Sequence, residues 1–289
     1  MRRPLFNRVT IVGLGLIGGS VGMALKRRGL ARQIYGVARR SAALRQAKAR
    51  RAVDTGGLRL ADGLKGAELV LIATPPQAVE EVARQVARFF SGDRLLLTDV
   101  ASTKGRIVSS LDRLLPPRIR FVGSHPMAGS ERSGLPAADP ELFDGAVCVV
   151  TRTPRTDAGA LSEVCALWRS LGSRIQILDP ASHDSWAAQV SHLPHLTAAG
   201  LVLTADRKAL GLAAGGFADS TRVALSDPEL WSQIFSTNRP AVLKALNRFL
   251  QRMDRLRRAI AQGKIRSLHR QLLLARSQRR RIPSQRSRR

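Results

Sequence analysis

The stretch "VTIVGLGLIGGSVGMALKRRGL", residues 9–30, constrains the fold of this chain more than any other. A short β-branched run leads directly into a G-x-G-x-x-G pattern, and a helix-compatible segment that ends near Gly29 follows. In a dinucleotide-binding fold Gly13 makes the tight turn, Gly15 lets the backbone approach a pyrophosphate, and Gly18 packs the helix against the strand. The pattern therefore predicts a first βα unit with a pyrophosphate at the N-terminus of its helix.

The same residues could instead form a targeting signal, because "MRRPLFN" places two arginines before an apolar run. A secretory signal core is rich in Leu or Ala and ends at a small-residue cleavage site, whereas this run carries the glycine pattern. Cys148 and Cys165 lie in apolar contexts without the spacing of metal ligands, so they predict buried thiols in a reducing compartment. We therefore expect a cytoplasmic protein with no membrane segment.

Strand-like and helix-like segments alternate over the first 179 residues. Apolar runs predict strands at "QIYGV", "AELVLIATP", "RLLLTDV", "RFVGSHP", "AVCVVT" and "RIQILD". Segments with helical spacing predict helices at "AALRQAKARRAV", "PQAVEEVARQVARFF" and "TKGRIVSSLDRLL". This alternation is typical of α/β proteins with right-handed βαβ units and a sheet covered on both faces. The expected fold class is α/β, a Rossmann-like dinucleotide-binding domain followed by an all-α domain.

The β-branched runs stop after "RIQILD", and the rest of the chain has a helical pattern. We expect a Rossmann-like dinucleotide-binding domain over residues 1–179, a helical domain over 180–275, and a basic disordered tail over 276–289. Apolar residues at helical spacing between residues 231 and 274 exceed what one domain of this size needs. They predict a homodimer formed through these helices.

The formal net charge of +27 at pH 7 would ordinarily favour binding to nucleic acid or to an anionic membrane. Seven arginines lie in the tail "RSQRRRIPSQRSRR", and removing their charge leaves +20 spread over the remaining residues. One Tyr and three Trp are available to stack on bases, and no RNA-binding motif is present. We expect a basic surface that favours small anionic ligands, with no specific nucleic acid and no membrane as partner.

Two polar segments, "TDVASTKG" and "GSHPMAGSERSG", follow predicted strands, and ligands bind at the carboxyl ends of strands in this fold class. Their polar side chains of interest are Ser102, Thr103, Lys104, Ser124, His125 and Glu131. A single Ser or Thr in such a loop is most often a helix cap. His125 is different, because the proline that follows it fixes it at a strand end, where a histidine can transfer protons at neutral pH.

The helical region carries His183, His192 and His195 within "HDSWAAQVSHLPHL". Their separations of nine and three residues, without paired cysteines or an H-E-x-x-H pattern, predict no metal site. Arg222 lies in the polar segment "GGFADSTR". Its guanidinium could pair with a ligand carboxylate or could be an ordinary surface group.

Five segments in this order, "GLGLIGGS", "TDVASTKG", "GSHPMAGSERSG", "SHLPH" and "GGFADSTR", resemble the prephenate/arogenate dehydrogenase family of tyrosine biosynthesis. The resemblance extends from about Val9 into the late helices, and "SHPMAGSE" is far more specific than the glycine pattern. It implies oxidation of a cyclohexadienyl substrate, in which hydride leaves ring C4 for a nicotinamide while the ring carboxylate departs as carbon dioxide. It also implies an active site between the nucleotide domain and a helical domain that dimerises.

The same resemblance implies roles for individual residues. His125 matches the family's catalytic histidine, which accepts the proton of the C4 hydroxyl, and Ser102 matches a serine that hydrogen-bonds the same region. Arg222 would hold a substrate carboxylate through a charge-assisted pair. The candidate substrate-binding residues are His192, His195, Arg222, Glu131 and Ser124.

The end of the second predicted strand bears on the choice of cofactor. NAD-dependent proteins of this fold carry an Asp or Glu there, which binds the adenosine ribose hydroxyls. Here Ala38 stands at or near that position and is followed by Arg39, Arg40 and Ser41, which can bind a 2′-phosphate. We therefore expect NADP rather than NAD. The candidate cofactor-binding residues are Gly13, Gly15, Leu16, Ile17, Gly18, Arg39, Arg40, Ser41, Thr74, Pro75 and Ser102.

The expected substrate is L-arogenate, which would be converted to L-tyrosine, because the compact chain without a fused mutase or regulatory domain is similar to the short cyanobacterial and plant-type members of the family. The alternative is a prephenate dehydrogenase, which forms 4-hydroxyphenylpyruvate, or a cyclohexadienyl dehydrogenase of dual specificity. Glu131 is a candidate to bind the arogenate ammonium group. It could equally gate the site or pair with a nearby arginine.

Two other classes of protein are weighed against this one. A β-hydroxyacid or imine reductase shares the nucleotide domain, but it would place a catalytic Lys on the interdomain helix, where this chain has histidines. A nucleotide-dependent sensor or a nucleic-acid-binding protein would have no need of His125, Ser102 and Arg222 together. The enzyme of the first family is therefore the favoured hypothesis.

Overall fold

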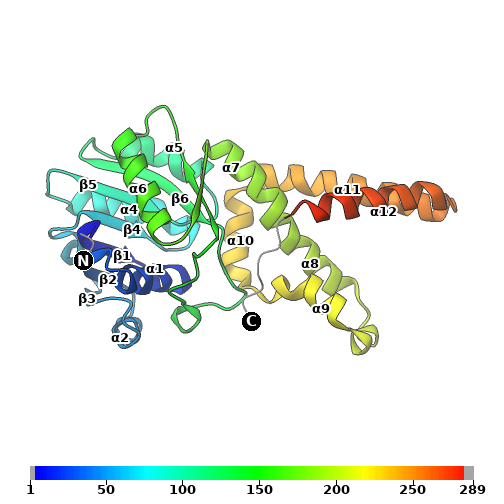
Figure 1. Cartoon of the computed structure of the whole chain (residues 1–289), viewed down its shortest axis with the longest axis horizontal. Coiled ribbons are helices and arrows are strands. Elements are labelled where there is room, and N and C mark those ends of the chain that lie inside the picture. The colour runs from blue at the N-terminus through cyan, green and yellow to red at the C-terminus, as the bar shows by residue number, and fades with distance from the viewer. Residues whose placement is uncertain (1–3, 283–289) are drawn as a thin grey trace. The chain divides into compact units, whose positions relative to one another are not determined.

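The computed structural model describes residues 4–282, and an eight-stranded sheet with helices on both faces forms its N-terminal part (Figure 1). The strands are β1 (Phe6–Val12), β2 (Ala31–Val37), β3 (Thr55–Gly57), β4 (Leu69–Ile72), β5 (Leu95–Asp99), β6 (Ile119–Pro126), β7 (Val147–Thr151) and β8 (Arg174–Leu178). The helices around them are α1 (Leu16–Arg27), α2 (Ser41–Ala49), α3 (Leu60–Leu64), α4 (Val79–Phe89), α5 (Gly105–Leu114) and α6 (Ala158–Ser170), with short 3₁₀ turns η1 (Pro76–Ala78) and η2 (Leu135–Ala137). The predicted Rossmann-like α/β class is confirmed.

The strand order β3-β2-β1-β4-β5-β6-β7-β8 reverses direction between β1 and β4. Strand β1 pairs in parallel with both β2 and β4, so its carboxyl end lies at the point where the crossovers diverge. Gly13 N donates to Val37 O at 3.0 Å, and Ala73 N donates to Val12 O at 2.7 Å, which closes the ladder on both sides of this point. In open α/β sheets ligands bind in this crevice.

Each face of the sheet has its own hydrophobic core, and the four residues of β4 show why. Leu69 and Leu71 point into a core shared with α1, α2 and α6, whereas Val70 and Ile72 point into a core shared with α3, α4 and α5. All four side chains are fully buried. A strand covered on both faces has no solvent side, so its sequence is continuously apolar rather than alternating.

One strand departs from the expected succession of parallel βαβ units. Strands β1 to β6 pair in parallel, but β7 pairs antiparallel with β6, in a register that places His125 opposite Val149. The connection over residues 127–146 contains only the turn η2, and without a crossover helix the chain returns in the opposite direction. Helix α6 then carries the chain across to β8, which is parallel to β7.

The C-terminal part is helical, as expected. Its elements are α7 (Pro180–Ala187), the π-helical turn η3 (Ala188–His192), α8 (Leu193–Thr204), η4 (Ala209–Leu212), α9 (Gly215–Thr221), η5 (Arg222–Leu225), α10 (Pro228–Thr237), α11 (Arg239–Ala261) and α12 (Ile265–Arg280). Helix α7 begins where the Asp179 carboxylate accepts hydrogen bonds from the N–H groups of Ala181 and Ser182, at 3.0 and 2.9 Å. Pro194, in the first turn of α8, has no N–H to complete the hydrogen bonding of the preceding turn.

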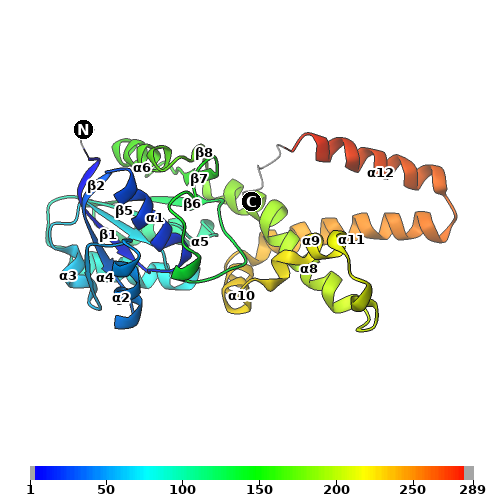
Figure 2. The same ribbon diagram turned by 60° about the horizontal axis from the view of Figure 1, so that its bottom comes forward.

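The chain divides into two compact units, the first ending at Val242 and the second beginning at Leu243, and α11 crosses the division. The second unit is a hairpin in which α12 runs antiparallel to α11 (Figure 2). Helix α12 continues to Arg280, so residues 276–280 of the predicted tail are helical, because no Pro or Gly interrupts them. Residues 283–289 lie outside the described residues. The predicted domain limits, residues 1–179, 180–275 and 276–289, stay predictions.

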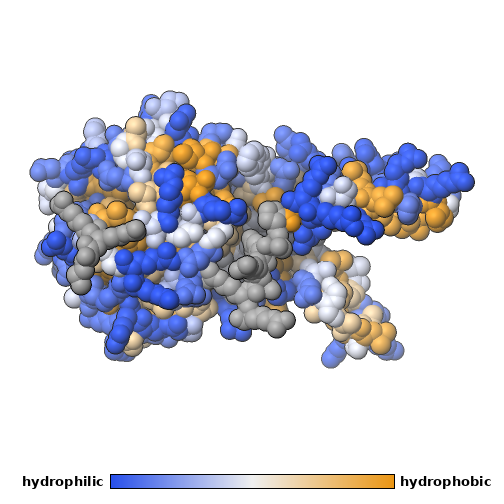
Figure 3. Space-filling model, in the orientation of Figure 1, coloured by the Kyte–Doolittle hydropathy of each residue, from blue (hydrophilic) through white to orange (hydrophobic). Residues whose placement is uncertain are grey.

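Several large apolar side chains of the hairpin are exposed on its surface. Much of the face shown in Figure 3 is hydrophilic, and apolar side chains gather on the surface of the hairpin. Leu250, Met253, Ile260 and Leu272 are 45–63% exposed there. Apolar surface of this extent on paired helices is typical of a surface that another chain covers.

Candidate active site

The glycine turn after β1 has the geometry that the sequence predicted for it. Gly13 has a φ of +97°, and a Cβ there would lie 2.5 Å from Ala73 O, so no other residue fits. A Cβ on Gly18 would lie 2.0 Å from Gly13 O, so Gly18 packs the helix against the turn. Nothing lies within 4 Å of a Cβ built on Gly15, which leaves the backbone accessible to a ligand.

The N-terminus of α1 and the loop after β4 fit a dinucleotide. Helix α1 begins at Leu16 with no side-chain cap and no acidic residue in its first turn, so its N–H groups remain free to bind phosphate oxygens. Leu16 and Ile17 are half-buried beside this turn. Thr74 Oγ1 is buried and has no hydrogen-bond partner within residues 4–282, whereas Pro75 is exposed next to it. An orphaned hydroxyl at the switch point is consistent with a polar ligand there.

The end of β2 carries no carboxylate. Strand β2 ends at Val37, and Ala38, Arg39 and Arg40 follow before α2 begins at Ser41. Arg39, Arg40 and Ser41 are exposed, and their side chains make no hydrogen bond or ion pair with any other described residue. Two unpaired guanidiniums and a hydroxyl at this edge fit a phosphate group better than a ribose hydroxyl pair.

A buried ion pair lies at the carboxyl end of β5. Asp99 and Lys104 are both fully buried, and Lys104 Nζ donates to Asp99 Oδ2. Burial lowers the pKa of Lys104, while the negative charge of Asp99 acts in the opposite direction. Asp99 Oδ1 has no partner in the described part of the chain. Sequence reasoning noted Lys104 but assigned it no role, and it missed Asp99.

Ser124 and Ser102 differ in what their hydroxyls can do. The Ser124 hydroxyl is fully buried and donates to Asp99 O at 2.6 Å, so it joins β6 to β5 and is not free to bind a substrate. The Ser102 side chain is half-buried in the loop after β5, and its hydroxyl makes no hydrogen bond with the residues described. Of these two predicted site residues, Ser102 is the one available to a ligand.

His125 lies at the end of β6 and is only 7% exposed. Its Nδ1 lies 2.9 Å from His183 Nε2, and His183 Nδ1 lies 2.8 Å from Asp184 Oδ1. Burial lowers the pKa of His125 well below its ordinary value, and the neighbouring His183 and Lys104 act in the same direction. A neutral imidazole can accept a proton at a ring nitrogen, so His125 has the chemistry of a general base.

His192, the last residue of the π-helical turn, is fully buried beside this group. Asn238 Nδ2 lies 3.3 Å from His192 Nδ1 and donates to Asp184 O at 2.8 Å. Burial lowers the pKa of His192 to about 4, against the opposing effect of Asp184. His192 Nε2 is buried and has no hydrogen-bond partner within residues 4–282, and the backbone of Ser102 lies close enough to oppose the lowering of the pKa of His192.

His195 follows one turn later on α8. Its Nδ1 donates to Ser191 O at 2.9 Å, and its ring stacks on the Trp231 indole, with ring centroids 3.3 Å apart and an interplanar angle of 22°. These two contacts fix the ring from both sides. Burial lowers the pKa of His195, and the backbone of Ser191 opposes this effect. Trp231, on α10, was not a predicted site residue.

Arg222 and Glu131 form an ion pair between Arg222 Nη1 and Glu131 Oε2. The guanidinium side chain is 55% exposed and the carboxylate side chain 25%. Of the roles considered for Glu131, the structure shows the pairing with an arginine.

Three of the residues that sequence reasoning missed, Asp184, Asn238 and Trp231, contact Lys104, His192 and His195 at sequence separations that no local motif spans. The fourth, Asp99, lies in the segment "TDVASTKG" only five residues before Lys104, so that segment itself was the signal that could have found it. His183 was noticed as a possible metal ligand. In the part of the chain described, no group of three His, Cys, Asp or Glu side chains could hold a metal ion. The structure uses His183 instead to contact His125.

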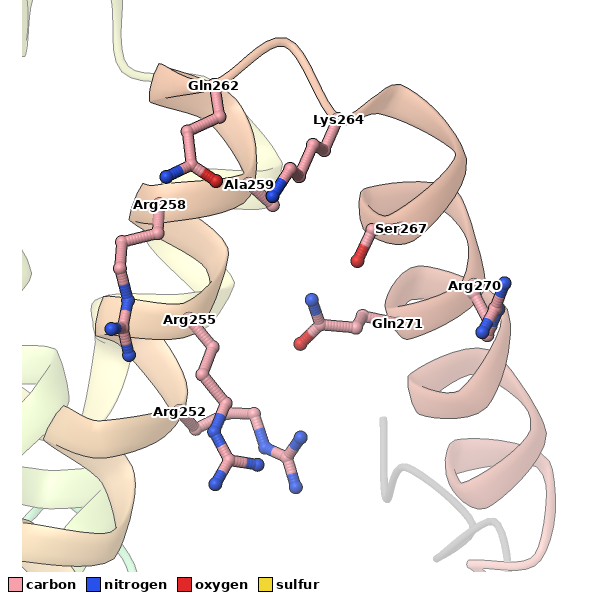
Figure 4. Close-up of a pocket in the computed structure, with 9 residues that line it drawn as sticks. All are labelled: Arg252, Arg255, Arg258, Ala259, Gln262, Lys264, Ser267, Arg270 and Gln271. Carbon is pink, nitrogen blue, oxygen red and sulfur yellow. The ribbon is translucent and has the colours of Figure 1, made fainter.

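The second unit contains a hollow of about 460 Å³ between α11 and α12, and none of the predicted site residues lines it (Figure 4). Its cationic lining residues are Arg252, Arg255, Arg258, Lys264 and Arg270. No carboxylate lines it.

No helix within residues 4–282 is long and apolar enough to cross a membrane.

Two family models match this chain. The model described as "Prephenate dehydrogenase, nucleotide-binding domain" matches residues 21–177, and the one described as "Prephenate dehydrogenase, dimerization domain" matches residues 179–274. The prephenate dehydrogenase of Bacillus subtilis (strain 168) is 32% identical over 283 residues, which cover 96% of this chain and 76% of that relative.

Solved structures agree with these matches. The crystal structure of prephenate dehydrogenase from A. aeolicus, in complex with hydroxyphenyl propionate and NAD+, is similar with a TM-score of 0.88 and 31% identity, over 96% of this chain and 98% of that chain. Synechocystis arogenate dehydrogenase is similar with a TM-score of 0.80 and 32% identity, over 94% and 98% of the two chains. The protein is an oxidoreductase that binds a nicotinamide dinucleotide, and the chain belongs to the prephenate/arogenate dehydrogenase family.

Proposed function

We propose that this protein is an NADP-dependent arogenate dehydrogenase, with prephenate, or both substrates, as the alternative. The observation that carries the proposal is His125, a buried histidine that contacts His183 and whose pKa is lowered by burial, with His183, Lys104 and His192 acting in the same direction. Oxidative decarboxylation of a cyclohexadienol needs a neutral base at the C4 hydroxyl, and a neutral, buried histidine meets that need.

In this reaction His125 would accept the proton of the C4 hydroxyl while hydride leaves C4, so no positive charge accumulates on the carbon that becomes the phenol carbon. The bond between the ring and its carboxylate breaks to release carbon dioxide, its electron pair makes the ring aromatic, and the ring oxygen recovers a proton to give the phenol. The nicotinamide, when bound, accepts the hydride. Ser102, whose half-buried hydroxyl makes no hydrogen bond with the residues described, would hydrogen-bond the same hydroxyl. General-base assistance of this kind contributes about 10²–10⁴-fold to the rate.

The other predicted residues would bind and orient the substrate. Arg222 would hold a substrate carboxylate, and its existing pair with Glu131 means that one carboxylate would have to exchange for another. His192 Nε2 and the half-buried ring of His195 would supply further polar contacts. Once Arg222 binds the substrate, the carboxylate of Glu131 becomes available to an ammonium group, which arogenate carries and prephenate lacks.

Steady-state kinetics with both substrates tests the substrate assignment. We expect kcat/KM to be higher for arogenate than for prephenate, and we expect Glu131→Gln to lower kcat/KM for arogenate more than for prephenate, because only arogenate presents a cation. Equal losses for the two substrates would leave Glu131 as a partner of Arg222 alone. A higher kcat/KM for prephenate in the unmodified protein would establish the alternative.

The cofactor proposal is NADP, supported by the missing carboxylate after β2 and by the unpaired guanidiniums of Arg39 and Arg40. The glycine turn, the free N-terminus of α1 and the orphaned Thr74 hydroxyl would hold the pyrophosphate and the neighbouring ribose. These groups would bind NAD and NADP equally, so the residues after β2 would decide between the two cofactors. The A. aeolicus relative is described with NAD+ bound.

We also propose a homodimer formed through the helices of residues 231–274. The exposed apolar residues of α11 and α12, and the family description of residues 179–274 as a dimerisation domain, support it. Light scattering at micromolar concentration should give the mass of two chains, and a monomer would contradict the proposal. A reducing, cytoplasmic location is proposed with it, since Cys148 and Cys165 are buried and unbridged.

A further inference from the structure

A chain of three polar side chains extends from the carboxyl end of β6 into α7. His125 Nδ1 lies 2.9 Å from His183 Nε2, and His183 Nδ1 lies 2.8 Å from Asp184 Oδ1. All three residues are buried, and the two rings meet edge to face, with centroids 5.1 Å apart and an interplanar angle of 65°. Two rings in this orientation can share one hydrogen between them.

Asp184 fixes the direction of the first hydrogen bond. Its Oδ1 accepts from Lys104 N at 2.7 Å and its Oδ2 accepts from Gly105 N at 2.8 Å. Burial by itself would raise the pKa of Asp184, but the hydrogen bonds from His183, Lys104 and Gly105 lower it below the ordinary value. An ionised carboxylate only accepts hydrogen bonds, so His183 must carry its hydrogen on Nδ1.

The hydrogen on His183 Nδ1 determines the remaining positions. When the imidazole of His183 is neutral, its hydrogen on Nδ1 leaves a lone pair on Nε2, so His183 Nε2 accepts a hydrogen bond. Its neighbour at 2.9 Å, His125 Nδ1, must therefore donate. His125 then has its lone pair on Nε2, the ring nitrogen that does not contact His183. If His125 carried its hydrogen on Nε2, two lone pairs would face each other at 2.9 Å in a buried site.

We propose that His183 and Asp184 are positioning residues, which hold His125 in the tautomer with its hydrogen on Nδ1 and its basic lone pair on Nε2. This inference rests on the proposed function, in which His125 Nε2 accepts the hydroxyl proton of the substrate. The proton moves from the C4 oxygen to His125 Nε2, and the imidazolium that forms keeps its Nδ1 hydrogen bond to His183. Neither His183 nor Asp184 has to touch the substrate.

Asp184 has a second task that complicates its use as a probe. By accepting from the N–H groups of Lys104 and Gly105 it caps the N-terminus of α5, so a substitution there would disturb the backbone that carries Ser102. His183 has no such task, since its hydrogen bonds to other side chains are those with His125 and Asp184. His183 is therefore the residue to change.

Nitrogen-15 NMR of the histidine rings tests the tautomer without any turnover. The chain has five histidines, so His125→Asn identifies the signals of His125 by their loss. At a pH near 8 we expect the ring of His125 in the unmodified protein to be neutral, with its hydrogen on Nδ1. A hydrogen on Nε2, or an even mixture of the two tautomers, would overturn the proposal.

Two substitutions at position 183 then connect the tautomer to the rate. In His183→Leu the acceptor is lost, so the His125 signals should show a mixture of tautomers, and kcat should fall by at least about tenfold with KM changed by less than about twofold. In His183→Gln the side-chain oxygen can accept from His125 and the amide group can donate to Asp184. This variant should keep the Nδ1 tautomer and retain kcat within about threefold of the original value.

The outcomes are separable. Equal losses of kcat in the two variants, with the Nδ1 tautomer kept in both, would overturn the positioning role. If His183→Leu does not fold, the spectrum of the unmodified protein and the behaviour of His183→Gln still decide the matter. Absence of turnover with both arogenate and prephenate in the unmodified protein would overturn the proposed function, and the NMR result would then stand by itself for the tautomer.

Discussion

The polar cluster around His125 and the hairpin of α11 and α12 carry charge in opposite ways. In the cluster the cation Lys104 is fully buried and is bound to Asp99. The helices α11 and α12 contain seven and five Lys and Arg residues but only one acidic residue, Asp254, and the cationic side chains that line the hollow are exposed. Most of the hairpin's charge is solvated and unpaired.

The difference shows that buried charges, rather than exposed ones, indicate where the candidate site lies. An exposed guanidinium costs little wherever it lies, so the excess of cations on the hairpin raises the net charge without defining a ligand. A buried ion costs several kcal/mol unless its partners are fixed, so the group Asp99, Lys104, His125, His183 and Asp184 requires a precise arrangement. The most charged region of this protein is therefore distinct from its candidate site.

The sharpest test of the comparison is the same change of histidine to asparagine in each region. His125→Asn should lower kcat by about 10²–10⁴-fold with a modest change in KM, because the proton transfer matters in the transition state. His269→Asn, on the exposed surface of α12, should leave steady-state kinetics unchanged. A His125→Asn enzyme with unmodified kcat would remove this residue from the role of base.

A second test compares two carboxylates that bind cations. Asp99→Asn leaves Lys104 buried without an anion, and the free energy of unfolding should fall by about 3–5 kcal/mol. Asp254→Asn removes the partner of Arg257 and Arg258 on the exposed face of α11, where no measurable change is expected. Denaturant titration measures both. A similar loss of unfolding free energy in the two variants would contradict this difference between buried and exposed ion pairs. It would indicate that Asp254 lies in a buried interface.

The third test uses pH. The pKa of His192 is lowered from 6.5 to about 4 in the folded protein, so between these values the unfolded chain binds more protons than the folded one. The free energy of unfolding contributed by this group should therefore fall as the pH drops from about 6.5 to 4, by about 3 kcal/mol in total. Relative to the unmodified protein, His192→Gln should flatten the dependence in that window. An unchanged slope would show that His192 is solvated like the exposed His269.

Arg222 gives a smaller expected effect. Arg222→Ala should raise KM by the equivalent of about 1.5–3 kcal/mol with little change in kcat, because a carboxylate pair present in the ground state is lost. Arg252→Ala, in the cationic hollow of the hairpin, serves as the control and should leave KM unchanged. If the two variants raise KM equally, the effect reflects general attraction of an anionic substrate by the net charge.

The smallest expected effect concerns cofactor choice. We expect kcat/KM with NADP to exceed that with NAD by at least about tenfold, equivalent to about 1.4 kcal/mol, and Arg39→Ala should erode this ratio by weakening NADP alone. Arg266→Ala on α12 should leave the ratio unchanged. Turnover with NAD that equals or exceeds turnover with NADP would refute the cofactor assignment.

Much of the nucleotide-binding fold could be predicted because its signals are local. The strand, the glycine turn and the helix of residues 6–27 are adjacent in the chain, and the continuous apolar run of β4 reports burial on both sides. Strand β3 was missed because its three residues, "TGG", contain two glycines and no apolar run. The direction of β7 depends on a connection without a helix, which its own sequence does not reveal.

In the candidate site, too, residues in local motifs could be predicted, whereas contacts between distant parts of the chain could not. His125 and Ser102 stand in motifs, so their positions could be predicted from the chain, whereas the contact between His125 and His183 joins residues 58 positions apart. That contact exists because α7 packs where Asp184 can cap α5. Cys148 and Cys165, predicted as buried thiols, are buried because both lie in apolar surroundings that a sequence displays directly.

The π-helical turn η3 has a consequence for how this site can vary between lineages. A π-helical turn contains one residue more than an α-helical turn, and each residue of an α-helix advances the side-chain direction by about 100°. Loss of a single codon within residues 188–192 would therefore rotate α8 relative to α7 and carry His195 away from Trp231, while His183 kept its place. The direction in which His195 points relative to His183 can therefore change through an insertion or a deletion within residues 188–192, whereas a point substitution there leaves it unchanged.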